Sequence, residues 1–197
     1  TKKNGSTGNV NITTHGSESD GIMAASLNTN SGIAAVSIVA AGKVTITADR
    51  DGLSSFDADA SAATTGWQGA GKTNITITGA DGVDITSNSR NHKLNDSGLL
   101  IESANGDVNI SGKTYGISLK VSSNLDKAEG LENGITGKIV GNNVNITASE
   151  NNAIEIVNNG NLTVASNVEN GNIVLDSGND IAIDVTGADS ILNLGSE

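Results

Sequence analysis

At residues 8–13 the chain reads Gly8-Asn9-Val10-Asn11-Ile12-Thr13, and variants of this phrase recur along the whole sequence. The centre of each phrase is a triplet whose first and third residues are apolar. A spacing of two residues places both apolar side chains on the same face of an extended strand. The triplets expected to form one wall of the fold are Val10-Asn11-Ile12, Val44-Thr45-Ile46, Ile75-Thr76-Ile77, Val108-Asn109-Ile110, Val144-Asn145-Ile146 and Ile173-Val174-Leu175.

The first residues of these triplets are 34, 31, 33, 36 and 29 positions apart. A nearly constant period of this length is typical of a solenoid. A second apolar strand follows each triplet after a short interval. These second strands are expected at Gly21-Ile22, Gly52-Leu53, Gly82-Val83-Asp84-Ile85, Gly116-Ile117-Ser118-Leu119, Ile154-Glu155-Ile156 and Ile183-Asp184-Val185.

A third strand is visible in most repeats, at Ile33 to Ile38, Leu99 to Ile101, Ile135 to Val140, Leu162 to Val164 and Ile191 to Leu194, and it is placed near Ala62 to Thr64 in the second repeat. Three short strands separated by Gly, Asn, Asp and Ser turns make one triangular coil. Stacked coils pair each strand in parallel with its copies. We therefore expect one all-β domain over residues 1–197, a right-handed parallel β-helix of about six triangular coils with loop insertions at one corner.

The composition supports this architecture and limits the function. The chain has 25 Gly, no Pro, no Cys, and one residue each of Trp, Tyr and Phe, so its core must be built from Val, Ile, Leu and Ala. The absence of Cys excludes disulfides and thiolate metal sites. The net charge of −11 argues against nucleic-acid partners, which need clustered Lys and Arg, and against adsorption to anionic membranes.

Extra residues between the second and third strands predict protruding loops near residues 57–72, 87–97 and 122–134. Loops on a rigid scaffold are where binding residues concentrate. Our hypothesis is that these loops form a ligand-binding surface, with tolerated decoration of the rod as the alternative. The loop residues that could contact a ligand are Trp67, Arg90, His92, Lys93, Asp126, Lys127 and Glu129.

Three Asp-Gly pairs, Asp20-Gly21, Asp51-Gly52 and Asp81-Gly82, precede the expected second strands of consecutive coils. Stacking would place their carboxylates in one column, and a column of carboxylate oxygens is suited to Ca²⁺. The alternative is a set of Asp-Gly turns, in which Asp bonds its own backbone. Turns are the preferred interpretation, and no other cofactor is expected.

The enzymatic alternative is a secreted polysaccharide lyase or glycosidase on a β-helical scaffold. Glycosidases need two carboxylates flanking the scissile bond. Asp84, Glu155 and Asp184 would face outward from the second wall and could supply such a pair. Ligand pockets are usually lined by apolar and aromatic side chains, and this chain has three aromatic residues in total. We therefore expect no enzymatic activity.

The phrases at residues 8–13, 106–111 and 141–147 resemble the passenger repeats of bacterial autotransporter adhesins, and they are similar to those of filamentous-haemagglutinin-type exoproteins. The resemblance lies in the pattern of the repeats, extends over nearly the whole chain and assigns no functional residue. It implies an exported, non-enzymatic protein of the Gram-negative cell surface that mediates adherence, aggregation or biofilm formation.

On this interpretation the chain, which starts at Thr1 and ends after a strand-like segment, is a fragment of a longer passenger. Its expected partners are a host extracellular-matrix protein, a glycan or a sister copy of the same adhesin, with no nucleic acid and no insertion into a membrane. A purely structural stalk is a further alternative. The sequence does not name the ligand.

Overall fold

The computed structural model describes residues 8–24, 33–55, 72–94, 97–120, 134–178 and 181–196. These residues form eighteen β-strands and no helix, so none of them belongs to a helix that could span a membrane. The strands follow one another in groups of three, and each group makes one coil. The six coils, numbered in chain order, are β1–β3, β4–β6, β7–β9, β10–β12, β13–β15 and β16–β18.

Equivalent strands of successive coils form three walls. The first wall contains β1 (Val10–Thr13), β4 (Val44–Ala48), β7 (Val83–Ser87), β10 (Val108–Gly112), β13 (Val144–Ala148) and β16 (Ile173–Ser177). The second wall contains β2 (Ile22–Ala24), β5 (Leu53–Ser55), β8 (Arg90–Leu94), β11 (Tyr115–Lys120), β14 (Ile154–Val157) and β17 (Ile183–Thr186). The third wall contains β3 (Ile33–Ala40), β6 (Lys72–Gly79), β9 (Ser97–Glu102), β12 (Ile135–Gly141), β15 (Gly160–Ser166) and β18 (Ile191–Ser196).

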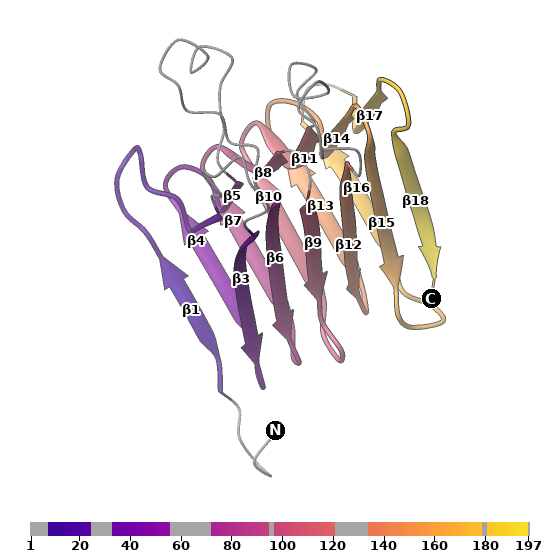
Figure 1. Ribbon diagram of the computed structural model, residues 1–197. Helices are drawn as coiled ribbons and strands as arrows, with labels where there is room; N and C mark the ends of the chain where they lie inside the picture. The colour runs from indigo at the N-terminus through magenta and orange to yellow at the C-terminus, as the bar shows by residue number, and fades with distance from the viewer. Residues whose placement is uncertain are drawn as a thin grey trace.

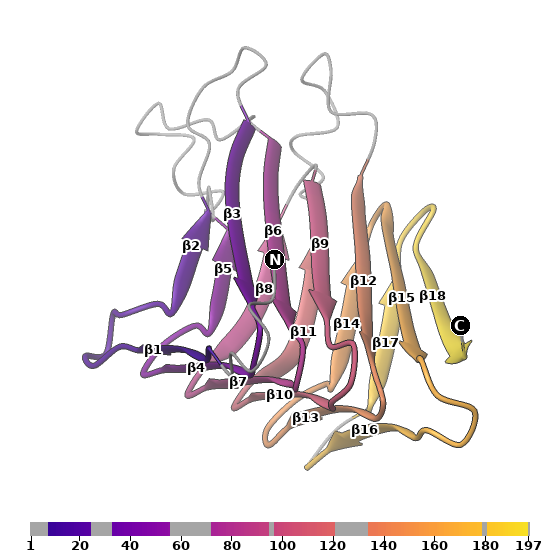
Figure 2. The ribbon, with the colours of Figure 1, turned by 90° about the horizontal axis from the view of Figure 1, so that it is seen from below.

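Every strand pairing in the walls is parallel, which confirms the expected parallel β-helix. Figure 1 shows the coils stacked side by side from the N-terminal to the C-terminal end of the rod. The view from below separates the first wall from the second and third walls (Figure 2). With neighbouring strands ~4.8 Å apart, five coil-to-coil steps span about 24 Å.

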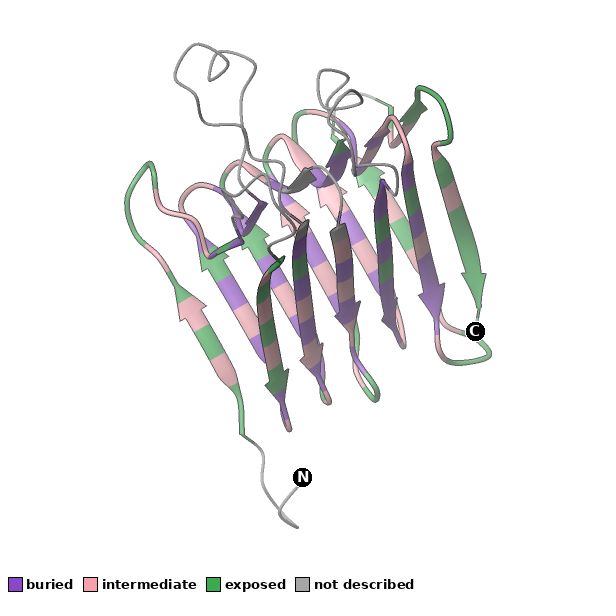
Figure 3. Ribbon diagram, viewed as in Figure 1, coloured by how far each residue is buried: buried purple, intermediate pink, exposed green. Residues whose placement is uncertain are grey.

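The core is a set of apolar ladders that run along the rod. In the first wall the inward residues of four successive strands, from Val44 and Ile46 to Val144 and Ile146, are at most 1% exposed. Their neighbours on the strand face outward, and this alternation appears as bands in Figure 3. Each buried Val or Ile contributes roughly 1.5–3 kcal/mol, and each needs a neighbouring coil to cover it.

The sequence-based assignment of the third triplet to the first wall is wrong. Ile75 and Ile77 belong to β6 in the third wall, where they pair with Val36 and Ile38. The first-wall strand of the third coil is instead β7, which begins at Val83. Strand β6 also replaces the third strand expected near Ala62 to Thr64, a segment that lies outside the described residues.

The protruding loop expected over residues 87–97 is also corrected by the structure. Residues Arg90–Leu94 form β8, the second-wall strand of the third coil, and β9 begins at Ser97. Residues 57–71 and 122–133 of the other two expected loops lie outside the described residues. In the sequence, the connections that hold them follow β5 and β11, so both join a second-wall strand to a third-wall strand.

One buried side chain bridges an interruption in the second wall. Strands β5 and β8 belong to separate sheets, and the side chain of Asn91 lies between them with no exposed surface. Its Oδ1 accepts the backbone N–H of Leu53 at 3.2 Å. Its Nδ2 donates to the carbonyl oxygens of Ser111 at 3.1 Å and Gly116 at 3.0 Å. Asn91 therefore joins the second, third and fourth coils where the backbone ladder is irregular.

Candidate functional site at the first corner

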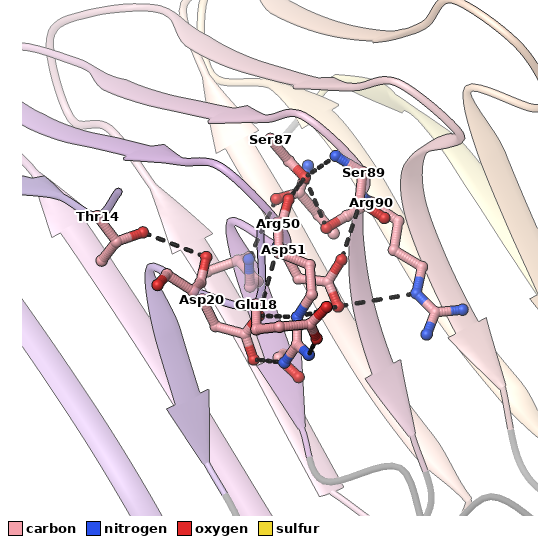
Figure 4. Close-up of polar contacts among 12 residues, drawn as sticks. Thr14, Glu18, Asp20, Arg50, Asp51, Ser87, Ser89 and Arg90 are labelled. Carbon is pink, nitrogen blue, oxygen red and sulfur yellow. Dashed lines mark hydrogen bonds and ion pairs between the residues drawn. The ribbon is translucent and has the colours of Figure 1, made fainter. Parts of the chain in front are cut away.

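The first corner is the turn that joins a first-wall strand to the second-wall strand of the same coil. Two features occupy it. In coils one to three it holds a group of charged side chains, the corner cluster, formed by Glu18, Asp20, Arg50, Asp51 and Arg90 (Figure 4). In coils three to six it holds an open groove. The backbone fixes both features, because each turn hydrogen-bonds to the turn of the next coil.

Arg50 is the centre of the corner cluster. Its Nε and Nη2 donate to the two carboxylate oxygens of Asp20 at 2.6 and 2.7 Å, and its Nη1 donates to Glu18 at 3.0 Å. A bidentate pair of this kind is among the stronger charge-assisted contacts in proteins. The hydrogen bonds to Asp20, then the charge of Asp20 and the hydrogen bond to Glu18, raise the pKa of Arg50 above its already high ordinary value, although partial burial opposes the rise.

Within the corner cluster, Asp51 is a buried carboxyl group whose surroundings act on its pKa in opposite directions. Its side chain is 5% exposed, and its Oδ2 lies 4.0 Å from Arg50 Nε and 3.8 Å from Arg90 Nε. Burial raises the pKa of Asp51 above the ordinary value of 3.8, and the charge of Asp20 adds to this effect. The charge of Arg90 and hydrogen bonds from Ser89 and from the Arg90 backbone oppose it. The ionised carboxylate of Asp51 is therefore held at a cost to stability.

We expect Asp51→Asn to change the pH dependence of stability. A raised pKa in the folded state means that the folded protein binds the Asp51 proton more tightly than the unfolded chain does. The resulting stability is fully present below pH 3.8 and is lost as the pH rises through the raised pKa. The free energy of unfolding of the wild type should thus fall relative to Asp51→Asn over this window.

Urea denaturation of both proteins, between about pH 3 and about pH 7, measures this difference. Asp176→Asn, which removes one exposed carboxylate, controls for the loss of a negative charge. A difference between wild type and Asp51→Asn that stays constant with pH would contradict the expectation.

The groove continues along the same corner and has a volume of about 880 Å³. It crosses four coils, so it extends about 14 Å along the rod at ~4.8 Å per coil. Small and polar residues form its lining because each first-wall strand ends in them. The lining residues are Ser87, Asn88, Ser111, Gly112, Lys113, Thr147, Ala148, Ser149, Asp176 and Gly178.

The floor of the groove is held by bonds between coils. The backbone N–H of Ser149 donates to the carbonyl of Gly112 at 3.3 Å, and that of Gly178 donates to the carbonyl of Ala148 at 2.8 Å. The hydroxyl of Ser149 donates to the carbonyl of Lys113 at 3.2 Å. These bonds fix the shape of the groove before any ligand arrives, which lowers the entropy lost on binding.

The charges beside the groove are nearly balanced. Lys113 pairs with Glu150 at 3.1 Å, and both side chains are about half exposed. Asp176 supplies one further carboxylate from the first wall of the last coil. Ser87 connects the groove to the corner cluster, since its hydroxyl lies 2.6 Å from the carbonyl oxygen of Arg50 and 2.9 Å from that of Arg90, and its single hydrogen can be donated to either. The first corner thus carries an ion-paired region and an open, nearly neutral groove lined by small and polar residues.

The residues predicted to bind a ligand are only partly placed by the structure. Arg90 lies in the corner cluster beside Asp51 rather than in a loop. His92 and Lys93 are in β8, at register positions opposite Ser118 and Leu119. The remaining four predicted residues, Trp67, Asp126, Lys127 and Glu129, lie outside the described residues.

The expected column of three Asp-Gly carboxylates is not formed. Asp20 and Asp51 do lie in adjacent coils before β2 and β5, and Arg50 contacts both. Asp81 instead precedes β7 of the first wall, at a different corner. In the described part of the chain, no group of three or more His or acidic side chains is arranged to hold a metal ion. The cation beside Asp20 and Asp51 is the chain's own guanidinium.

The carboxylates considered for polysaccharide cleavage are divided between two walls. Asp84 lies on the first wall, where it pairs with Lys43 and accepts a hydrogen bond from Asn109 at 2.8 Å. Glu155 and Asp184 are register partners on β14 and β17 of the second wall. The hydroxyl of Ser118 donates to Glu155 at 2.6 Å. Of the three candidate carboxylates, only Glu155 and Asp184 are therefore neighbours that could act together on a glycosidic bond.

Sequence reasoning did not find the groove. Its signal is present in the sequence as small or polar residues at the end of each first-wall strand, such as Ser87-Asn88, Gly112-Lys113 and Ala148-Ser149. These pairs align only when the coils are in the correct register. Comparisons of the chain with models of protein families, with curated proteins and with solved structures find no match.

Proposed function

We propose that this chain is a non-enzymatic segment of an exported bacterial cell-surface adhesin, and that it binds a neutral glycan along the groove of the first corner. The observation that carries the proposal is the groove itself, an open, preformed depression lined by small and polar residues of four successive coils. Its volume is within the range of about 300–1,000 Å³ found for ligand sites.

The chemistry of the lining supports a glycan as the ligand. Hydroxyl, amide and backbone groups at successive coils present hydrogen-bonding partners at a regular spacing, which suits a linear chain of sugar hydroxyls. The net charge of −11 repels sulfated and sialylated chains. A neutral glycan avoids this repulsion, so its binding should depend little on salt. The resemblance to autotransporter adhesins supports the surface location.

A glycan array with the purified chain tests the proposal. We expect retention of neutral glycans, and at least a tenfold loss of affinity in Thr147→Arg, which is about 1.4 kcal/mol. Thr147 lines the groove, so the long arginine side chain would block it. The matched control is Thr136→Arg, which makes the same change at an exposed position on β12 of the third wall.

Binding that Thr147→Arg and Thr136→Arg affect equally would contradict the groove as the site. Exclusive retention of anionic glycans would contradict the charge argument. Retention of matrix proteins in place of glycans would reject the glycan as the ligand.

Polysaccharide cleavage is a second candidate, favoured by the register pair of Glu155 and Asp184. Glycosidases use two carboxyl groups about 5–9 Å apart, one of them as a general acid. The products released from each retained glycan distinguish the two functions. Cleaved oligosaccharides that disappear in Glu155→Gln would reject a purely adhesive role.

A further inference from the structure

A ladder of hydrogen-bonded side chains runs along the outer face of the first wall in coils three to five. Asp84, Asn109 and Asn145 are register partners on β7, β10 and β13. Nδ2 of Asn145 donates to Oδ1 of Asn109 at 2.8 Å, and Nδ2 of Asn109 donates to Oδ1 of Asp84 at 2.8 Å. The other carboxylate oxygen of Asp84 pairs with the ammonium group of Lys43, the residue before β4. The ladder therefore begins at an ion pair and ends at the amide of Asn145.

The carboxylate of Asp84 sets the direction of this ladder. A carboxylate only accepts hydrogen bonds, whereas a side-chain amide has an accepting oxygen and a donating nitrogen. Asn109 must therefore turn its nitrogen toward Asp84 and its oxygen toward coil five. Asn145 follows in the same sense, so its Oδ1 is directed toward coil six. The register partner of Asn145 in coil six is Val174, whose side chain has no hydrogen-bonding atom.

This end of the ladder borders the groove of the first corner. Thr147 lines the groove and lies two residues after Asn145 on β13, so both side chains point outward from the same face, about 6.7 Å apart. Strand β13 is paired on both sides, so Asn145 is accessible because it faces outward from an interior strand. A sugar bound over Thr147 thus reaches Asn145 and can place its C–H groups against Val174.

We propose that Asn145 is a specificity-determining residue for the glycan of the groove, and that it selects a sugar hydroxyl that donates to its Oδ1. This role rests on the proposed function, because it adds one contact to the same site. An O-methylated sugar has no hydrogen to donate at this position and would leave the oxygen of Asn145 without a partner. Sites built to bind a hydroxyl discriminate strongly against analogues that lack it, because their own polar groups are then left unpaired.

Asp84→Asn is the informative variant, because it should reverse the ladder without changing the shape of any side chain. The ammonium group of Lys43 only donates, so it holds the oxygen of the amide that replaces Asp84, and the nitrogen of that amide then faces Asn109. Asn109 and Asn145 turn over in response, and Asn145 presents its Nδ2 in place of Oδ1. The matched control is Asp107→Asn, which removes the same charge from an exposed residue outside the ladder.

Hydrogen exchange of the Asn145 side-chain amide, measured by NMR, reports the direction of the ladder without any ligand. In the wild type this amide donates to Asn109, whereas in Asp84→Asn it would face Val174. We therefore expect exchange about tenfold faster in Asp84→Asn, the effect of one hydrogen bond, and wild-type exchange in Asp107→Asn. Circular dichroism establishes that both variants are folded. Equal exchange in the wild type and Asp84→Asn would overturn the assigned direction and the role of Asn145.

Titration with neutral oligosaccharides tests the contact itself. The probes are cellohexaose, laminarihexaose and maltohexaose, each with free hydroxyls and as the methyl ether. The wild type and Asp107→Asn should bind a free form at least about tenfold more tightly than its ether. Asp84→Asn should reduce this ratio about tenfold, because the Nδ2 of Asn145 donates to a hydroxyl or an ether oxygen alike. The change in the ratio isolates Asn145, since methylation also removes hydroxyls from the rest of the groove.

The outcomes separate this role from the proposed function. The same ratio in the wild type and Asp84→Asn would overturn the role of Asn145 and leave glycan binding in place. Binding of none of the three oligosaccharides would count against glycan binding and the role of Asn145 together, whatever the direction of the ladder.

Discussion

Replacement of Asn91 by leucine is expected to lower the free energy of unfolding by about 4 kcal/mol, because each buried backbone group left without a partner costs ~1–3 kcal/mol. Leucine has nearly the same shape but no polar atom. The variant would leave the N–H of Leu53 and the carbonyls of Ser111 and Gly116 without the partner that Asn91 supplies. Leu53 lies on β5, at the break between the two sheets of the second wall, whereas Ser111 and Gly116 belong to β10 and β11 of the fourth coil.

The matched control for Asn91→Leu is Asn74→Leu. Asn74 also accepts a backbone N–H of the next coil, that of Gly98 at 3.0 Å, but its side chain is exposed. Water replaces this partner, so the control should lose no more than about 1 kcal/mol. Urea denaturation with circular dichroism measures both variants. A loss at Asn91 no larger than that at Asn74 would show that the bridge contributes little to stability.

Asn91→Asp separates hydrogen bonding from packing at the same position. Aspartate keeps an oxygen for the N–H of Leu53 but loses both donors to the carbonyls of Ser111 and Gly116. It also places a carboxylate in a site with no exposed surface. Burial of an unpaired charge is costly, so this variant should be strongly destabilised at neutral pH and should recover in acid as the carboxylate takes up a proton.

Asn91 also explains why the sequence predicts the fold class correctly but assigns two strands near the third coil to the wrong walls. The β-helix was predictable because pairs of apolar residues two positions apart recur in nearly every strand. Strand β8, with the sequence Arg90-Asn91-His92-Lys93-Leu94, lacks this alternation, and its buried inner position is occupied by Asn91. Because β8 has no apolar alternation, the spacing of the apolar pairs places the strand at Val83 in the second wall and Ile75 in the first, whereas Val83 begins β7 of the first wall and Ile75 lies in β6 of the third.

The candidate site was less predictable because it depends on neighbours in space. The groove exists only where small residues of four coils stack, and one shifted coil breaks that alignment. For the corner cluster, the sequence indicated carboxylates at Asp20 and Asp51 but suggested a metal ion or a turn. The turn that carries Arg50 lies one coil away from Asp20, and its guanidinium reaches back across the coil boundary. Charge pairing between coils leaves no periodic signal in a single sequence.

Removal of the Arg50 guanidinium is expected to destabilise the rod by about 3 kcal/mol, the low end of the range for a buried ion pair that loses one partner, because Asp20 is buried but the Arg50 side chain is 33% exposed. In Arg50→Met the methionine keeps much of the aliphatic packing of arginine. Asp20, whose side chain is 4% exposed, then loses both hydrogen bonds of its bidentate pair. Asp51 loses one of its two neighbouring positive charges. Two carboxylates, at the junction of coils one and two, would be left without Arg50.

A double variant identifies the uncompensated charge as the cause. Adding Asp20→Asn to Arg50→Met removes a carboxylate whose side chain is 4% exposed, so the double variant should be more stable than Arg50→Met alone. This order follows because an unpaired buried charge costs more than a neutral amide of the same shape. If lost packing at Arg50 were the cause, the destabilisations of the two substitutions would add, and the double variant would be less stable than Arg50→Met. A double-mutant cycle of unfolding free energies measured in urea distinguishes these outcomes.

Lys113→Met provides the exposed comparison for Arg50→Met. Lys113 pairs with Glu150 at 3.1 Å, close to the 3.0 Å between Arg50 and Glu18, and both side chains are about half exposed. Exposed pairs contribute between 0 and about 1 kcal/mol, so the loss should be several-fold smaller than at Arg50. Equal losses at the two positions would mean that burial does not set the strength of the corner cluster. A large loss at Arg50 alone would show that its ion pairs hold the first coil to the second.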